Sequence, residues 1–294
     1  MPRRFWLRFM AENTREFHFV FGLRVQNEPF HILHYLCLES CRQVNRPHKI
    51  HLHLRHRPHG LWWERIAPHL QIHIIDNAPL AFDTAKYADS AEGRYIAAAD
   101  FSYAHEADFL RLQILLKHGG VYADMDTLFV RPYPERFYSH EFLIGEEAAI
   151  PDRNGILRPS LCNAVLFAKP QARFAQEWLR RMGEVFDGTW NRHSCDEAAR
   201  VWSDVPQCVT VAPTAAFYPF ATTPAGIAAL FVENSTLPRG ACSVHLWAHL
   251  WWQEQRIDFT LFHAGLLTAD YVRTADTTYA NLARRFLDRF DDAH

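Results

Sequence analysis

The first 75 residues alternate between strand-type and helix-type segments, and this alternation restricts the fold more than any other feature. Residues 18–23 are a β-rich run, and residues 30–44 place apolar side chains at helical spacing. Residues 49–54 alternate apolar and polar side chains, which predicts a strand with one exposed face. A short helix over 62–69 and a strand over 71–75 follow. Repeated strand–helix–strand order is typical of an α/β protein with a mostly parallel central sheet flanked by helices.

The middle of the chain continues this pattern with an amphipathic helix over residues 104–118. Gly119 and Gly120 follow it directly, and glycine ends helices well because it tolerates left-handed backbone geometry. A buried strand over residues 121–125 then leads into Asp126. The later part of the chain predicts strands over 141–145, 163–168, 208–212 and 243–246, helices over 171–185 and 196–202, and a final helix over 271–290 outside the main sheet.

The composition describes one globular domain. The chain has 294 residues, 49% of them hydrophobic, which is enough for one large core, and no repeat or linker divides it. The formal net charge of −2 gives no basic excess of the kind that nucleic-acid binding requires. Six cysteines without a CxxC pair favour reduced thiols and a cytoplasmic location.

The sequence predicts no membrane-spanning segment and no signal peptide, because no apolar stretch reaches 18 residues. Residues 1–10 mix three arginines with aromatic residues. Two interpretations stay open for them: a solvated terminus, or a weak peripheral contact at the inner face of a membrane.

Asp124 and Asp126 are two residues apart at the end of the predicted strand, so they are expected to share one face. Two carboxylates on one face repel each other unless they are solvated, protonated or bridged by a cation. Mg²⁺ and Mn²⁺ commonly bind one or two carboxylates together with substrate phosphates. An isolated D-x-D is a weak signal, and a solvated strand end is the alternative. Asp108 and Arg111 lie three residues apart on the preceding helix, either as a surface ion pair or beside the same cleft.

The block from Ala107 to Arg111 and from Leu115 to Asp126 resembles the sugar-binding region of the DXD glycosyltransferases. That family (glycosyltransferase family 32) includes initiation α-1,6-mannosyltransferases and α-1,4-galactosyltransferases, with the large clostridial glucosylating toxins as distant members. Ala107 stands where the family often has serine. The resemblance implies a GT-A fold that binds a nucleotide-sugar in one domain, with residues 17–130 as the nucleotide-sugar half, 131–262 as the acceptor and metal-completing half, and 263–294 as a C-terminal helix.

Other segments are similar to family elements outside this block. Residues 17–22 resemble the first strand, which lines the nucleotide site and brings in Phe19 and Gly22, with Phe21 where tryptophan is common. Residues 162–165 resemble the segment that follows the metal strand. Residues 217–220 and 245–247 resemble the C-terminal F-Y-P and H-x-W elements of the galactosyltransferases.

By resemblance, each candidate residue receives a role. Asp126 is a direct ligand of Mn²⁺ or Mg²⁺, and Asp124 binds the ribose or the metal through water. His245 is a third metal ligand or contacts the phosphate. Asp108 and Arg111 hold the donor sugar and phosphate. Candidates with a competing structural explanation are Asn163 (donor or acceptor contact), Asp196 (sugar contact, or only a helix cap), Trp247 with Trp251 and Trp252 (a cover, or core), His249 (competitor of His245), and Glu146 and Glu147 (acceptor side).

The resemblance implies a retaining transfer of a hexose from a nucleotide-sugar to a glycan or glycolipid hydroxyl. UDP-galactose or UDP-glucose is the first expected donor and GDP-mannose the next. No nucleophile stands out, so front-face attack assisted by the leaving diphosphate is expected. Three alternatives remain: a toxin-like effector that glycosylates a host protein, a non-catalytic nucleotide-sugar-binding protein, and a metal-dependent phosphotransferase. The last lacks a phosphate-cradling GxxxxGK[ST] loop.

A second concentration of possible ligands is the run His48, His51, His53, His56 and His59. His51 and His53 share a strand face. No carboxylate or cysteine lies among them, and Arg55 and Arg57 add positive charge, so a solvated edge strand is the expected interpretation.

Overall fold

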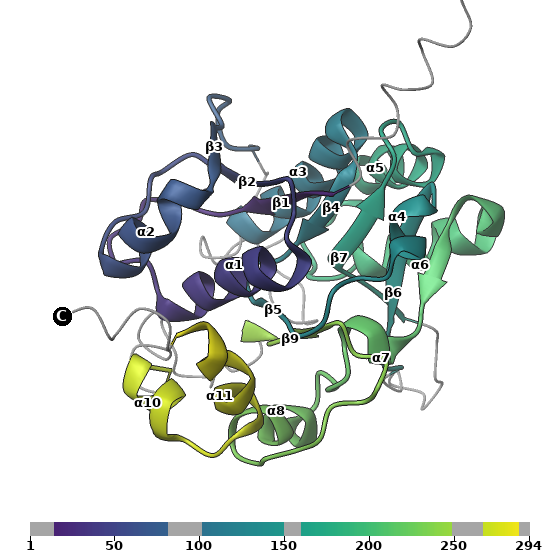
Figure 1. The fold of residues 1–294 in the computed structure, drawn as a ribbon. Helices are drawn as coiled ribbons and strands as arrows, with labels where there is room; N and C mark the ends of the chain where they lie inside the picture. The colour runs from purple at the N-terminus through teal and green to yellow at the C-terminus, as the bar shows by residue number, and fades with distance from the viewer. Residues whose placement is uncertain (1–14, 82–101, 150–159, 249–266, 288–294) are drawn as a thin grey trace, which may run out of the picture.

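A seven-stranded sheet forms the centre of the protein in the computed structural model, which describes residues 15–81, 102–149, 160–248 and 267–287. The strand order is β3-β2-β1-β4-β7-β6-β8 (Figure 1). The strands are β1 (Glu16–Val20), β2 (Lys49–Leu54), β3 (Gln71–Ile74), β4 (Gly120–Ala123), β6 (Phe142–Glu147), β7 (Ser160–Ala168) and β8 (Thr210–Ala212).

Four of the six strand pairs are parallel: β1 with β2, β1 with β4, β2 with β3, and β6 with β8. The exception is β7, which runs antiparallel to both of its neighbours, β4 and β6. The predicted α/β class with a mostly parallel central sheet is therefore confirmed.

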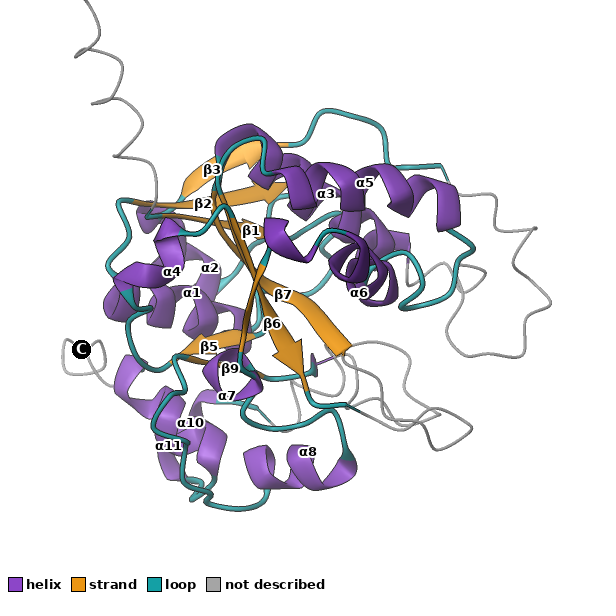
Figure 2. Ribbon diagram, turned by 90° about the vertical axis from the view of Figure 1, so that its right-hand side faces the viewer, coloured by secondary structure: helices purple, strands orange, loops and turns teal. Residues whose placement is uncertain are grey.

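Helices cover both faces of this sheet. Figure 2 shows α1 (Ile32–Asn45), α2 (Leu61–Ile66) and α4 (Glu135–Ser139) on one side, and α3 (Ser102–His118), α5 (Arg173–Val185) and α6 (Cys195–Asp204) on the other. Strand β1 contributes side chains to the cores on both faces of the sheet, because successive side chains point to opposite faces. Phe17 and Phe19 join the core on the α1 side, whereas Val20 joins the core that contains α3 and α5.

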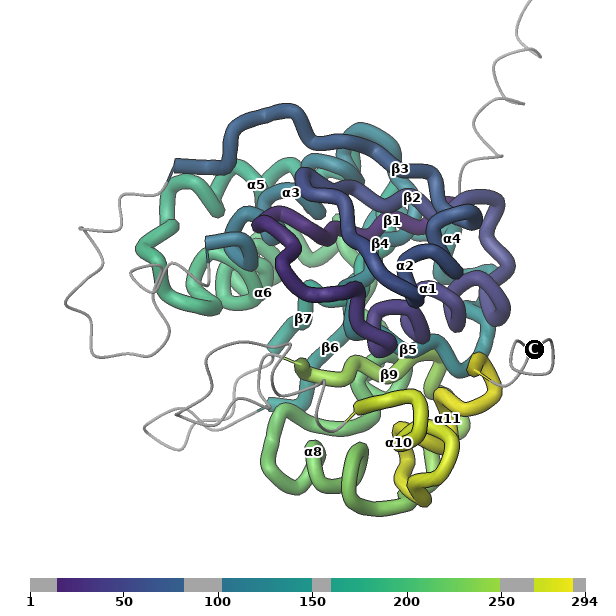
Figure 3. Tube along the Cα trace, turned by 90° about the vertical axis from the view of Figure 1, so that its left-hand side faces the viewer, coloured from purple at the N-terminus to yellow at the C-terminus, as the bar shows by residue number. Residues whose placement is uncertain are grey.

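A smaller layer lies beside the main sheet. It contains a two-stranded antiparallel sheet of β5 (Thr127–Phe129) and β9 (Ser243–His245). Figures 1 and 3 show the short helices of the C-terminal half gathered around it, and Figure 1 labels all of them. These helices are α7 (Thr214–Phe217), α8 (Pro224–Phe231), α10 (Ala269–Thr274) and α11 (Thr278–Ala283).

The predicted helix over residues 271–290 is wrong as one continuous element. The structure ends α10 at Thr274 and starts α11 at Thr278, and a short 3-10 helix, Arg284–Phe286, follows. Thr277 begins α11 by accepting a hydrogen bond on its side chain from the Ala280 amide. This capping residue is a local start signal that separates the two helices.

The cysteines and the lengths of the helices were also subjects of the sequence predictions. All six cysteines are free thiols, as expected from their spacing. Within the described ranges, no helix is both long enough and apolar enough to cross a bilayer. Residues 1–10, for which two interpretations stay open, lie outside the described residues.

Candidate functional site

Asp124 and Asp126 lie on the turn that follows β4, rather than on the strand itself. The Thr127 amide closes this turn by donating to the Asp124 carbonyl at 3.0 Å. All four residues of β4 are buried, so the turn begins at the end of a strand in the middle of the sheet. The expectation that strand alternation brings the two carboxylates together is therefore corrected: a tight turn does so.

His245 reaches this turn because β9 pairs with β5. In the antiparallel register Thr127 lies opposite His245, which places the imidazole next to the preceding residue, Asp126. His245 Nε2 is 2.9 Å from Asp126 Oδ1. The Ala248 amide donates to Asp126 Oδ2 at 2.9 Å. Two chain segments 119 residues apart thus converge on one carboxylate.

The residues Asp124, Asp126 and His245 each offer a ligand atom, and these atoms lie within 4.8 Å of one another. Burial raises the pKa of Asp124, and the neighbouring Asp126 raises it further, although Arg111 opposes this. Burial disfavours the charged form of His245, but the Asp126 carboxylate outweighs it and raises the pKa of this imidazole. The site therefore attracts positive charge. Two carboxylates and one imidazole fit a divalent cation that also binds phosphate oxygens.

Arg111 connects the acidic turn to helix α3. Its guanidinium lies 2.9 Å from Asp108 Oδ1 and 3.3 Å from Asp124 Oδ1, and it donates to the Asn163 carbonyl at 2.8 Å. It also stacks over the Tyr122 ring, 4.8 Å from the centroid. Tyr122 donates its hydroxyl to Asp124 Oδ1 at 2.7 Å. The surface ion pair considered for Asp108 and Arg111 is therefore wrong: Arg111 is buried and Asp108 is half-buried beside the DXD turn.

Asp108 is held on both oxygens. Asn163 donates its amide to Oδ1 at 2.7 Å, and His193 Nε2 lies 3.1 Å from Oδ2. Burial raises the pKa of Asp108, but the Arg111 charge and the His193 hydrogen bond together lower it below its usual value. Asp108 is therefore an ionised acceptor of hydrogen bonds. This property suits a group that binds sugar hydroxyls.

Sequence reasoning missed His193 and Tyr122. His193 is fully buried and reaches Asp108 from the segment before α6, 85 residues away in sequence. Tyr122 lies within the block that resembles the glycosyltransferases, but the sequence pattern indicates no role for its phenol. The only sequence signal for His193 is its position immediately before the predicted start of α6.

Asp196 and Glu147 are two further carboxylates that the sequence singles out, and they influence each other electrostatically. Asp196 is exposed in the first turn of α6, and Ser194 before it makes no side-chain capping bond. Glu147 ends β6, where burial raises its pKa to about 7, with Asp196 contributing to the rise and His245 opposing it. Glu147 therefore lies close enough to both His245 and Asp196 to be influenced by their charges.

Three other predicted residues occupy structural positions. The Phe19 ring is fully buried in the α1-side core, so its side chain is part of the core. Gly22 has φ +64°, and a Cβ there would lie 2.3 Å from the His56 carbonyl oxygen. Trp247 is 2% exposed and donates its indole N–H to the Phe220 carbonyl at 2.9 Å. A covering role for Trp247 is therefore wrong; the ring supports His245, with centroids 4.2 Å apart. His249, Trp251 and Trp252 lie outside the described residues.

The prediction of a solvated edge strand at the histidine run is also wrong. Strand β2 lies between β1 and β3 in the sheet. His51 and His53 are each only 8% exposed, and they pack among His18 and His73. The polar face of β2 is therefore an interior layer of imidazoles.

Comparison with known proteins agrees with this geometry. Residues 40–146 match the family model described as a glycosyltransferase sugar-binding region containing a DXD motif. The chain is 31% identical over 210 residues to Glucan organizing enzyme 1 of Cryptococcus neoformans var. grubii. The aligned region covers 68% of this chain and 52% of the fungal protein. The chain thus spans about half the length of this relative.

Among solved structures, similarity is low. The PaToxG glycosyltransferase has a TM-score of 0.43 with 14% identity, over 66% of this chain and 70% of its own. The 4-diphosphocytidyl-2C-methyl-D-erythritol synthase of Anaerococcus prevotii has a TM-score of 0.35 with 10% identity, over 70% and 89% of the two chains.

Proposed function

We propose that the chain transfers a hexose from a nucleotide-sugar to an acceptor hydroxyl. The match of residues 40–146 to the model of the glycosyltransferase sugar-binding region containing a DXD motif supports this. The observation that carries the proposal is the convergence of Asp108, Arg111, Asp124, Asp126 and His245 in one network. These are the donor-holding and metal-holding residues that the family resemblance assigns.

Asp124, Asp126 and His245 would hold a divalent cation, with Mn²⁺ or Mg²⁺ as the expected ion. Such a cation neutralises the diphosphate of the donor as it leaves. The raised pKa of His245 supports this assignment, because the two carboxylates already favour positive charge at that position. Asp126 is fixed on both oxygens by His245 and the Ala248 amide, so it keeps its orientation before any donor binds.

Asp108 is proposed to accept hydrogen bonds from hydroxyls of the donor sugar. Its ionised state and its bonds to Asn163 and His193 keep the carboxylate in one orientation. The guanidinium of Arg111 contacts Asp108, Asp124 and the Asn163 carbonyl. Its proposed role is therefore to position these groups beside the sugar and phosphate.

The acceptor is proposed to approach from the side of Asp196 and Glu147. Asp196 is exposed there, and Glu147 has a pKa near neutrality, so either carboxylate is suited to bind a hydroxyl. No group in the described site is placed as an obvious nucleophile. Given the retention that the family resemblance implies, we therefore propose a front-face transfer, in which the leaving diphosphate helps to deprotonate the acceptor.

We further propose UDP-glucose or UDP-galactose as donor, with GDP-mannose as the second choice. The name of the fungal relative refers to glucan, which favours a glycan acceptor over a glycolipid or a host protein. A non-catalytic nucleotide-sugar-binding protein remains the second candidate function. The six free thiols support a cytoplasmic location, since disulfides are rare there.

A thermal-shift screen of UDP, GDP and their sugars, each with and without Mn²⁺, tests the donor and the metal together. A ligand at 100 times its Kd stabilises the folded protein by about 2.7 kcal/mol. We expect a rise in Tm with one nucleotide only when Mn²⁺ is present, and no rise in Asp126→Ala. Asp270→Ala, an exposed carboxylate paired with Arg273, is the matched control and should behave like the wild type.

Release of free nucleotide from the same donors then separates an enzyme from a binding protein. Mn²⁺-dependent hydrolysis or transfer that Asp126→Ala abolishes supports the proposal. Binding without any turnover on glycan acceptors or water favours the non-catalytic alternative. Metal-independent turnover in Asp126→Ala would overturn the assignment of the site.

A further inference from the structure

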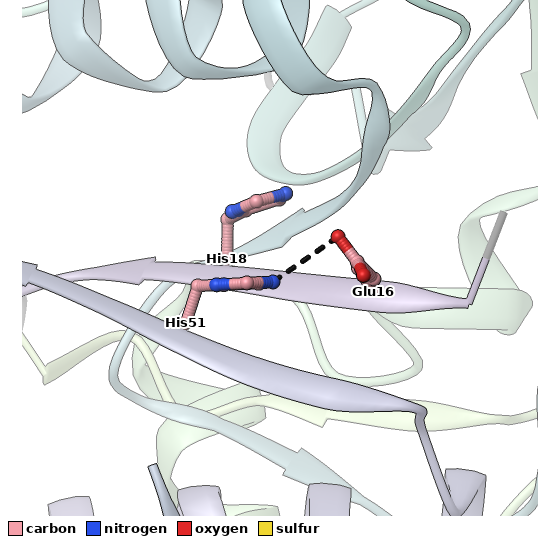
Figure 4. A group of neighbouring side chains, drawn as sticks. All are labelled: Glu16, His18 and His51. Carbon is pink, nitrogen blue, oxygen red and sulfur yellow. Dashed lines mark hydrogen bonds and ion pairs between the residues drawn. The ribbon is translucent and has the colours of Figure 1, made fainter. Parts of the chain in front are cut away.

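A second group of metal-ligating side chains lies at the beginning of β1 and β2. Glu16 and His18 are two residues apart on β1 and share a face of the strand. His51 lies beside His18 in the parallel register of β1 and β2. A carboxylate oxygen of Glu16 and one nitrogen from each histidine lie within 4.8 Å of one another (Figure 4).

Two further histidines contact the Nδ1 atoms of both imidazoles and so fix the orientation of the rings. His18 Nδ1 lies 3.2 Å from His53 Nε2, and His51 Nδ1 lies 2.8 Å from His73 Nε2. If each Nδ1–H donates in these pairs, the lone pair of each Nε2 is free and directed away from its partner. Figure 4 shows Glu16 at that end of the His51 ring, joined to its Nε2 by the dashed line. Metal-binding histidines generally have this second hydrogen bond, which fixes the tautomer.

His18 supplies an observation that hydrogen bonding within the cluster does not explain. The side chain is 2% exposed, and its Nε2 has no hydrogen-bond partner among the residues that the structure describes. Such a buried polar atom costs free energy unless something binds it. A Cβ at Gly120 would lie 3.3 Å from this nitrogen, so the glycine leaves space beside it.

We propose that Glu16, His18 and His51 form a second cation site, selective for a divalent transition metal of the zinc type. Imidazole nitrogens favour zinc, nickel, cobalt or copper, whereas Mg²⁺ and Mn²⁺ prefer oxygen ligands. Two ligands of a tetrahedral zinc ion lie about 3.3 Å apart. The 3.2 Å between His51 Nε2 and Glu16 Oε2 matches this spacing.

Completing the site needs only a small side-chain movement. The His18 and His51 rings are stacked, with centroids 4.7 Å apart and planes at 16°, so the His18 ring must tilt to bring its Nε2 onto a shared ion. The Glu16 side chain is 18% exposed, which gives the ion a route from solvent and leaves a fourth position for water. The bound ion would tie β1 to β2.

The second site is separate from the DXD turn. Gly120 is level with Glu16, whose carbonyl oxygen would lie 2.6 Å from a Cβ at this glycine. Asp124 follows four residues later, and four strand residues span about 13 Å. One ion cannot serve both groups, so zinc binding here does not depend on the proposed transferase activity.

Zinc titration of the chelator-treated full chain tests this inference, with Asp126→Ala as the background that removes the DXD site. We expect Asp126→Ala to bind about one equivalent of Zn²⁺. Adding Glu16→Gln, which keeps the side-chain shape, should weaken zinc affinity at least about tenfold. Adding His73→Gln, which removes the partner of His51, should weaken it about 10- to 100-fold. His48→Gln, an exposed histidine just before β2, is the matched control and should change little.

X-ray absorption of the zinc-loaded Asp126→Ala protein gives an independent measurement that does not require a further substitution. A first shell containing two imidazoles supports the site. A shell without imidazole would overturn the proposal, as would absence of zinc binding in Asp126→Ala or equal affinity in the Glu16→Gln protein. Circular dichroism confirms that each variant is folded before titration.

Discussion

Asn163 Nδ2 donates a 2.7 Å hydrogen bond to Asp108 Oδ1 and thereby joins strand β7 to helix α3 across 55 residues of sequence. The same residue accepts from Arg111 through its backbone carbonyl at 2.8 Å. Asn163 is therefore the point at which the two arms of the donor-holding network meet. Its side-chain amide donates a hydrogen bond to a carboxylate, which an ionised aspartate at this position could not do.

Asn163 substitutions test this relationship. Asn163→Ala removes a hydrogen bond to a charged group, which is worth about 1.5–3 kcal/mol, so kcat/KM for the donor should fall about 10- to 100-fold. Asn163→Asp should cost more, because it places a second carboxylate against Asp108. Steady-state kinetics with the donor identified by thermal shift measures both. Asn281→Ala removes a similar but exposed bond to Asp276 and should leave kinetics unchanged. Equal kinetics for Asn163→Asp and wild type would contradict the assignment.

Arg111 should be essential for the order of the site as well as for activity. Arg111→Met leaves the half-buried Asp108 and Asp124 without their shared cation. Breaking a fully buried pair costs about 3–5 kcal/mol, so we expect a loss of about 2–4 kcal/mol here. Urea denaturation measures the loss. Arg111→Lys keeps the charge but not the planar fork, so it should recover part of the stability and little of the turnover. Arg180→Lys, whose partners Glu177 and Glu184 are on the surface, should cost less than about 1 kcal/mol. A similar cost at both arginines would refute this interpretation.

Gly120 and Gly183 form a matched pair for backbone strain. A Cβ at Gly120 would lie 2.6 Å from the Glu16 carbonyl oxygen, and its φ of +89° disfavours any side chain. Gly120→Ala should therefore lower the free energy of unfolding by about 2 kcal/mol or more. Gly183 lies within α5 with nothing within 4 Å, so Gly183→Ala should raise it by about 0.5–1 kcal/mol. Thermal denaturation of both proteins gives the comparison. A stabilised Gly120→Ala protein would be incompatible with the described backbone conformation at Gly120.

The buried imidazoles should make the metal-free protein acid-sensitive. Burial lowers the pKa of His18 to about 2 and of His53 to about 3, against 6.5 for an exposed histidine. Between pH 6.5 and about 3 the unfolded chain therefore binds more protons than the folded one. The stability that the two neutral imidazoles contribute is complete above pH 6.5 and is lost as the pH falls.

Urea denaturation at pH 7, 6 and 5 after chelator treatment measures this effect. Each histidine contributes a slope of about 1 kcal/mol per pH unit, so His53→Gln should flatten the profile by that amount. His48→Gln, which is exposed, should leave the profile unchanged. An unchanged slope in His53→Gln would show that this imidazole is protonated in the folded state.

The sequence alone predicted the order and type of most elements, because strand and helix patterns depend on near neighbours. The helix over residues 104–118 appears as α3, Ser102–His118, and the strand over residues 49–54 appears unchanged as β2. Gly119 and Gly120 were read correctly as the end of α3, since their conformational freedom is a local property. The same local logic failed for residues 271–290, where the helical pattern continued through a break that Thr277 caps.

Only the tertiary structure decided which side chains meet. It brought His193 onto Asp108 and Glu16 beside His51, pairs separated by 85 and 35 residues. The histidine run contains no carboxylate, which argues against metal binding there, yet Glu16 on the neighbouring strand supplies one. Strand periodicity states which residues share a face, but not what packs on that face. Asp124 and Asp126 were found in sequence because they are two residues apart, whereas their partners depend on how strands are ordered across the sheet.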